Sequence, residues 1–183
     1  MRKIFASIAV LAALIAVAVF GQSTLASAST TSTVTAWPKS VIYVYDTTAG
    51  LKKSGQQVWP VKAAAAQWSR GGAVDVRYTS TGCPKNVQCV TVRQSELKDP
   101  TVGVTATSSV GSDIKSSSIT LDTTFGSKNS AARRQNVVCH EMGHALGLKH
   151  QATTSSCMNP YVTSERYPDA TDLKTLTTMY SHR

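Results

Sequence analysis

The sequence predicts one α+β domain in which helices pack on a mixed β-sheet. Three observations lead to this fold class. The chain has 183 residues, the length of a single domain, and 42% of them are hydrophobic, enough for a packed core. Strand-like and helix-like segments follow one another in the order strand, helix, strands, helix, coil, helix. Neither an internal repeat nor a second domain is evident in the sequence.

Strands are expected where β-branched and aromatic residues cluster or alternate with polar ones. These segments are residues 41–45, 74–78, 90–92, 102–107 and 119–122. Helices are expected at residues 58–70, 130–146 and 169–180. The first has an apolar stripe at helical spacing, made by Val61, Ala64, Ala65 and Trp68. Ser130 can cap the second helix.

The N-terminus has the pattern of an exported protein. Arg2 and Lys3 precede an apolar run at residues 4–20, and the cleavage signal Ala26-Ser27-Ala28 follows. A membrane anchor is the alternative, but the run is shorter than the ~20 residues of a spanning helix. No basic cluster follows it either.

We therefore predict a signal peptide at residues 1–28, a short flexible leader at 29–36 and a folded catalytic domain at 37–183. The product is expected to be secreted into the extracellular space, with no membrane partner after cleavage. The formal charge is 19 − 10 = +9 for the whole chain, and about +7 once the signal is removed. The basic residues are scattered without interleaved aromatics, so no nucleic-acid partner is expected. The protein is also expected to be a monomer.

Four cysteines in an exported chain indicate two disulfides, for which three pairings are possible. Cys83 and Cys89 flank a tight loop and are expected to pair. That leaves Cys139 to pair with Cys157.

The motif H-E-x-x-H-x-x-G-x-x-H stands at residues 140–150 and holds three of the four histidines. At ~100° per residue, His140 and His144 lie on one helix face, one turn apart, where both can reach one ion. His150 would lie ~15 Å further along a continued helix, so the helix must end between His144 and His150. Gly147 can end it in a left-handed conformation.

Three imidazoles leave the fourth zinc position for water, which is typical of a catalytic site. Glu141 projects beside the metal face and can take a proton from that water and later give it to the leaving amine. These groups together describe amide hydrolysis. The alternative, a helix with merely buried histidines, does not account for ligand spacing over the whole motif.

The motif resembles that of the metzincin zinc endopeptidases. Met158, eight residues after His150, stands where those enzymes have the methionine of their Met-turn. Within the group the chain is similar to the matrixins: Pro160 and Tyr161 resemble the wall of their S1′ pocket, and residues 118–122 their last strand before the active-site helix. The resemblance implies a five-stranded mixed sheet, an active-site helix, a backing helix and a small C-terminal subdomain that ends in a helix.

The chain also departs from the matrixin pattern. No cysteine precedes Cys83, so a cysteine-switch propeptide is missing, and acid clusters for structural calcium or a second zinc are not evident. We expect one catalytic zinc ion and no structural calcium. The snapalysins are similar in size and export, but their third ligand is an aspartate where this chain has His150.

The resemblance also suggests roles outside the motif. A Cys139–Cys157 bridge would tie the active-site helix to the Met-turn. The strand at residues 102–107 would be the edge strand along which a substrate lies, so Val102, Gly103 and Val104 are expected to bind substrate beside Pro160 and Tyr161. The function predicted is a secreted zinc endopeptidase that acts on proteins or peptides. Two alternatives remain: a secreted non-peptidase metallohydrolase, and a secreted zinc-containing binding module without proteolysis.

Overall fold

The computed structural model describes residues 34–183. The predicted signal peptide and most of the predicted leader lie outside the described residues. Within the described part, no helix combines the length and the hydropathy that a membrane span requires.

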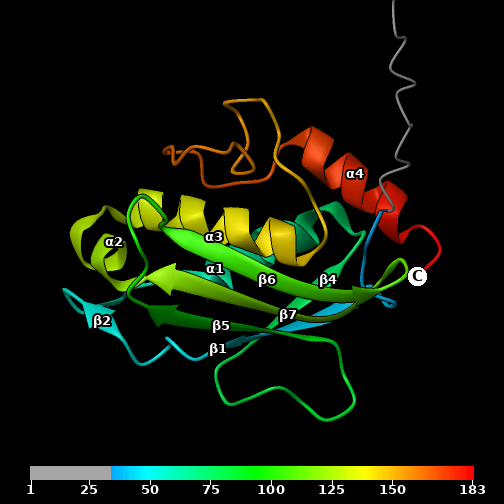
Figure 1. The fold of residues 1–183 in the computed structure, drawn as a ribbon, viewed down its shortest axis with the longest axis horizontal. Coiled ribbons are helices and arrows are strands. Elements are labelled where there is room, and N and C mark those ends of the chain that lie inside the picture. Colours follow the sequence, from blue (N-terminus) through cyan, green and yellow to red (C-terminus); the bar gives the residue numbers. More distant parts are fainter. Residues whose placement is uncertain (1–33) are drawn as a thin grey trace, which may run out of the picture. The chain divides into compact units, whose positions relative to one another are not determined.

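A mixed sheet of five strands forms one layer of the described domain (Figure 1). The strands are β1 (Val41–Asp46), β4 (Asp75–Thr79), β5 (Cys89–Ser95), β6 (Gly103–Val110) and β7 (Asp113–Asp122). Their spatial order is β4-β1-β5-β7-β6; β6 runs antiparallel to β7, and the other neighbours are parallel. The edge position predicted for the strand near residues 102–107 is thus confirmed. Two short strands, β2 (Lys52–Lys53) and β3 (Gln56–Gln57), form a separate hairpin.

The helices are α1 (Val61–Trp68), α2 (Thr123–Lys128), α3 (Ala131–Ala145) and α4 (Ala170–Tyr180), and one 3₁₀ turn (Ser69–Gly71) follows α1. Helices α1 and α3 lie over one face of the five-stranded sheet (Figure 1). They pack against each other, α3 also packs on β6 and β7, and α1 packs on β4. The buried core between them includes Trp68, Val44, Ile119 and Met142. This arrangement confirms the predicted α+β fold with an active-site helix and a backing helix.

Several element boundaries differ from the prediction. Helix α1 begins at Val61 instead of residue 58, after Pro60. Strand β7 begins at Asp113, six residues before the predicted start at Ile119, because its polar first half pairs with β6. Helix α2 was not predicted; the side chain of Asp122 caps it by accepting a hydrogen bond from Phe125 N at 2.6 Å.

The first residues of the described domain pack against strand β7 and the C-terminal end of α3. Ala36 is fully buried and forms a β-bridge with Asp113, so the ordered fold includes the last residue of the predicted leader. Trp37 Nε1 donates to the carbonyl oxygen of Ala145 at 2.9 Å. These contacts fix the N-terminal segment against the C-terminal end of α3, next to the motif residues.

Candidate metal centre and active-site cleft

Helix α3 carries the first half of the motif and ends where the sequence predicts. The hydroxyl of Ser130 accepts from Arg133 N at its start. At its other end Gly147 has φ +101°. Gly147 N donates to His144 O at 2.9 Å and Leu148 N to Gly143 O at 3.0 Å, the two bonds of a Schellman cap. The chain therefore leaves the helix after Leu146 and turns back toward its axis.

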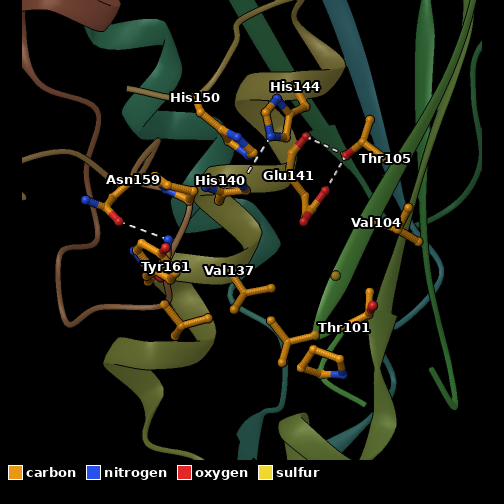
Figure 2. A pocket seen from close by; sticks show the side chains of 16 residues that line it. Thr101, Val104, Thr105, Val137, His140, Glu141, His144, His150, Asn159 and Tyr161 are labelled. Atoms are coloured by element: carbon orange, nitrogen blue, oxygen red, sulfur yellow. Dashed lines mark hydrogen bonds between the residues drawn. The ribbon is translucent and has the colours of Figure 1, made fainter. Parts of the chain in front are cut away.

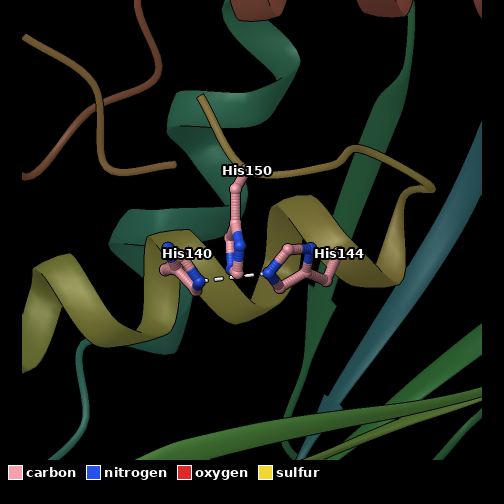
Figure 3. A group of neighbouring side chains, drawn as sticks. All are labelled: His140, His144 and His150. Carbon is pink, nitrogen blue, oxygen red and sulfur yellow. Dashed lines mark hydrogen bonds between the residues drawn. The ribbon is translucent and has the colours of Figure 1, made fainter. Parts of the chain in front are cut away.

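The reversal brings the three motif histidines together (Figure 3). Their ring centroids lie 4.6, 4.8 and 5.0 Å apart, and their nearest nitrogen atoms all lie within 4.8 Å of one another. Among the residues that the structure describes, no other group of three or more His, Cys, Asp or Glu side chains is arranged to hold an ion.

Two backbone contacts determine the ring tautomers. His140 Nδ1 lies 2.8 Å from the carbonyl oxygen of Cys157, and His144 Nδ1 lies 2.8 Å from that of Leu148. A carbonyl oxygen only accepts, so each Nδ1 carries a proton, and each Nε2 of a neutral ring presents a lone pair. The two Nε2 atoms are 3.1 Å apart. Two lone pairs at this distance have no proton to share, and a cation between them would satisfy both.

The donor set fits zinc. In a tetrahedral site with Zn–N of about 2.0–2.1 Å, two ligand nitrogens lie about 3.3 Å apart, close to the separation of His140 Nε2 and His144 Nε2. Backbone carbonyls that orient the far ring nitrogen are the usual outer partners of metal-binding histidines. Burial lowers the pKa of His140 to about 4, although its hydrogen bond to Cys157 opposes the shift, and burial also lowers the pKa of His150. Both rings are thus neutral near pH 7, the form that binds metal.

Glu141 lies beside the histidines and is only 7% exposed. Burial raises the pKa of its carboxyl to about 7, and the hydrogen bond from Thr105 acts in the opposite direction. Thr105 Oγ1 donates to Glu141 Oε2 at 2.6 Å, and Figure 2 shows the carboxylate between the histidines and β6. This carboxyl is placed to exchange a proton with a molecule bound in the cleft.

Met158 lies beneath the motif helix. It is fully buried, and a Cβ added to Gly143 would come within 2.3 Å of its sulfur, so the methionine packs directly on α3. A disulfide joins Cys139, next to His140, to Cys157, next to Met158. The second disulfide joins Cys83 to Cys89.

A polar network holds the turn that contains Met158. Met158 N donates to the hydroxyl of Ser156 at 2.8 Å, and this hydroxyl donates to the carboxylate of Asp172 in α4. Asp172 is fully buried, which raises the pKa of its carboxyl. The last helix is thereby connected to the floor of the site.

A cavity of about 630 Å³ opens beside the histidines, between α3, β6 and the segment after Met158 (Figure 2). Its lining includes all five residues for which the sequence predicts substrate contact: Val102, Gly103, Val104, Pro160 and Tyr161. Tyr161 is 77% exposed and Val104 is 44% exposed. These two side chains therefore stand at the rim.

Sequence reasoning missed several residues of this region, and the side chains of three of them bond to neighbouring elements. Thr105 and Asn136 line the cavity, and Asp172 supports its floor. Asn136 stands four residues before His140, one helical turn away, so helical spacing alone could have identified it. Its side-chain amide donates to Glu165 O at 2.5 Å and to Thr163 Oγ1 at 3.3 Å, which joins α3 to the segment across the cavity.

Two solved structures are similar to this chain. No curated protein matches the sequence. A chain of the GM1-bound form of the ECX AB5 holotoxin is similar with a TM-score of 0.53 and 16% identity, over 77% of this chain and 80% of that chain. Myroilysin is similar with a TM-score of 0.45 and 17% identity, over 81% and 83%. At such identity the holotoxin match shows the fold alone.

The matrixin family model matches residues 53–181, a span that includes the whole motif, the cavity and α4. The match confirms the metzincin resemblance seen in the sequence. Because it covers most of the chain, we conclude that this chain belongs to the matrixin family of zinc-dependent metallopeptidases.

Proposed function

We propose that this protein is a secreted zinc endopeptidase that cleaves extracellular proteins or peptides, with Glu141 as general base. The observation that carries the proposal is the convergence of three imidazoles within 4.8 Å beside a buried carboxyl group. His140, His144 and His150 would hold the ion. A structural zinc site has no use for the adjacent carboxylate, whereas a hydrolytic site needs a base there.

The zinc ion and the residues of the chain would each supply a different part of the reaction. Zinc, when bound, lowers the pKa of a water ligand to about 7 and polarises the carbonyl of the scissile peptide bond. Glu141 accepts a proton from the attacking water and returns it to the leaving amine. Met158 would support the histidines from below.

Substrate binding follows from the sheet. Strand β6 is the edge of the sheet, so one side of it presents unpaired backbone groups to which an extended peptide can add as a further strand. Val104 and Tyr161 lie on opposite sides of the cavity (Figure 2). The cavity lining includes the apolar side chains of Val102, Val137 and Pro160, and these favour an apolar side chain of the substrate.

Secretion and a monomeric state belong to the same proposal. The signal-like N-terminus supports export. The two disulfides suit an oxidising compartment, where they persist.

Chelation and one substitution test the function. We expect the purified protein to digest casein, to stop when a zinc chelator is added, and to recover when zinc is restored. Glu141→Gln keeps the side-chain size but removes the base, so kcat should fall at least about 10²-fold. Elemental analysis should find stoichiometric zinc in this variant, because the three histidines remain.

Glu96→Gln is the control, since Glu96 is exposed and does not line the cavity. Its activity should equal that of the unaltered protein. Undiminished casein turnover in Glu141→Gln would refute the role of this carboxylate. Cleavage of small esters without casein would indicate a non-peptidase hydrolase, and bound zinc without any hydrolysis would indicate a binding module.

A further inference from the structure

Two residues of strand β6, on the side of the strand that faces α3, lie against the side chain of Glu141. Alternate residues of a strand point to the same face, and Gly103 and Thr105 are such a pair. A Cβ added to Gly103 would lie 2.8 Å from Glu141 Cγ and 2.8 Å from Oε1. The glycine thus leaves the space that the glutamate side chain occupies.

Thr105 contacts both ends of the same glutamate (Figure 2). Its hydroxyl oxygen lies 2.6 Å from Oε2 and 2.9 Å from the backbone carbonyl oxygen of Glu141. The hydroxyl has one proton, and both oxygens accept it when the carboxyl group is ionised. One side chain of β6 therefore restrains the torsions that lie between the backbone and the carboxylate of Glu141.

We propose that Thr105 is a positioning residue for Glu141: it holds Oε2 and leaves Oε1 to accept the proton of the attacking water. The inference rests on the proposed function, in which Glu141 is the general base. It adds that the strand that binds the peptide along its edge also orients the base through its inner face. A substrate that docks on β6 therefore meets a carboxylate already held in one orientation, which lowers the cost of reaching the reactive geometry.

A purely structural role for Thr105 makes a different prediction. If the hydroxyl only fastened β6 to α3, its loss would lower stability or weaken substrate binding and leave kcat unchanged. If it orients the base, its loss lowers kcat while KM and zinc content stay the same.

The test compares Thr105→Val with Thr105→Ser in the zinc-loaded protein. Valine keeps the shape of threonine without the hydroxyl, and serine keeps the hydroxyl. We expect kcat for a peptide substrate to fall about tenfold in Thr105→Val, with KM within twofold, and to return to within about twofold in Thr105→Ser. Thr47→Val is the matched control: Thr47 follows β1 and does not line the cavity, and the substitution also removes a hydroxyl that donates to a backbone carbonyl at 2.9 Å. Its kcat should be unchanged.

Crystal structures of the same variants give a readout that does not depend on activity. The Glu141 carboxylate should occupy one orientation in the unaltered protein and in Thr105→Ser, and a different or divided orientation in Thr105→Val. An unchanged orientation with unchanged kcat in Thr105→Val would overturn the inference, and so would equal losses of kcat in the valine and serine variants. If the unaltered protein hydrolyses nothing, the proposed function fails, and the carboxylate orientation still decides whether Thr105 positions Glu141.

Discussion

Gly147 shows how one residue brings the three motif histidines together. Its positive φ lets the chain reverse so that His150 faces the two histidines of α3. Its missing side chain matters as well, because an added Cβ would lie 2.1 Å from the carbonyl oxygen of Thr35. The position therefore requires glycine for two separate reasons, backbone conformation and close packing of the N-terminal segment.

Gly147→Ala should lower the free energy of unfolding by about 2 kcal/mol or more, since left-handed backbone strain alone costs about 1–2 kcal/mol in a residue with a Cβ. It should also weaken zinc binding, because His150 moves with the cap. Urea denaturation and zinc titration measure the two effects. Gly72→Ala is the control: Gly72 has φ +70° and no atom within 4 Å of an added Cβ. This variant should show the strain cost with unchanged zinc affinity; equal zinc affinity in both variants would contradict our account of Gly147.

At the scale of elements, the site depends on how α3 is joined to the segment that follows it. The Cys139–Cys157 disulfide closes a separation of 18 residues, and the carbonyl of Cys157 accepts the Nδ1 proton of His140. The bridge therefore holds together a helix, one ring of the histidine cluster and the turn of Met158. The Cys83–Cys89 disulfide closes only 6 residues and ends at the first residue of β5, outside the cavity lining.

Replacing Cys139 and Cys157 together by alanine should lower the free energy of unfolding by about 3 kcal/mol in the chain-entropy model. Because the orientation of His140 is then less constrained, the variant should also lose zinc at lower chelator concentrations. The double alanine variant of Cys83 and Cys89 should lose about 2 kcal/mol, since its loop is shorter, and keep its resistance to chelator. Chemical denaturation and chelator titration compare the pairs. The same chelator resistance in both variants would show that the first bridge does not support the metal centre.

Across the whole domain, residues near the two ends of the described chain meet at the C-terminal end of α3. The hydroxyl of Tyr180, in α4, accepts from Trp37 N at 3.2 Å and donates to Leu146 O at 2.9 Å. The guanidinium of Arg183 donates to Asp113 Oδ1 at 2.9 Å. Residues far apart in the sequence thus fasten the helix end from which His150 departs.

Tyr180→Phe should lower the free energy of unfolding by about 1–3 kcal/mol, because it leaves the buried backbone groups of Trp37 and Leu146 without this partner. Burial also raises the pKa of Tyr180 from 10.0 to about 12. Between these values the folded state binds more protons than the unfolded state, so the tyrosine contributes stability that is complete below pH 10 and is lost as the pH rises toward 12. Thermal unfolding of both proteins from pH 8 to 12 should show a steeper decline in the unaltered protein. Parallel declines would mean that Tyr180 ionises as easily in the fold as in the unfolded chain.

The spacing of the motif determined much of the site without any tertiary information. His140, Glu141 and His144 are related by helix periodicity, and Gly147 follows from the backbone reversal that His150 requires; both are local properties of the chain. The strand and helix classes were likewise visible wherever apolar periodicity was strong. The local sequence pattern did not predict α2 or the first half of β7. The residues there are mostly polar, and their structure depends on contacts with other elements of the fold.

Only the tertiary structure decided which groups surround the motif. Thr105 is 36 residues from Glu141 in sequence, and it reaches the carboxylate because β6 is the edge strand and its register on β7 turns Gly103 and Thr105 toward α3. Asp172 reaches the turn of Met158 through α4 in the same way. A sequence encodes periodicity directly, because successive residues share one helix or strand. Contacts between separate elements depend on how all the elements pack together, so they cannot be predicted from the sequence of any single segment.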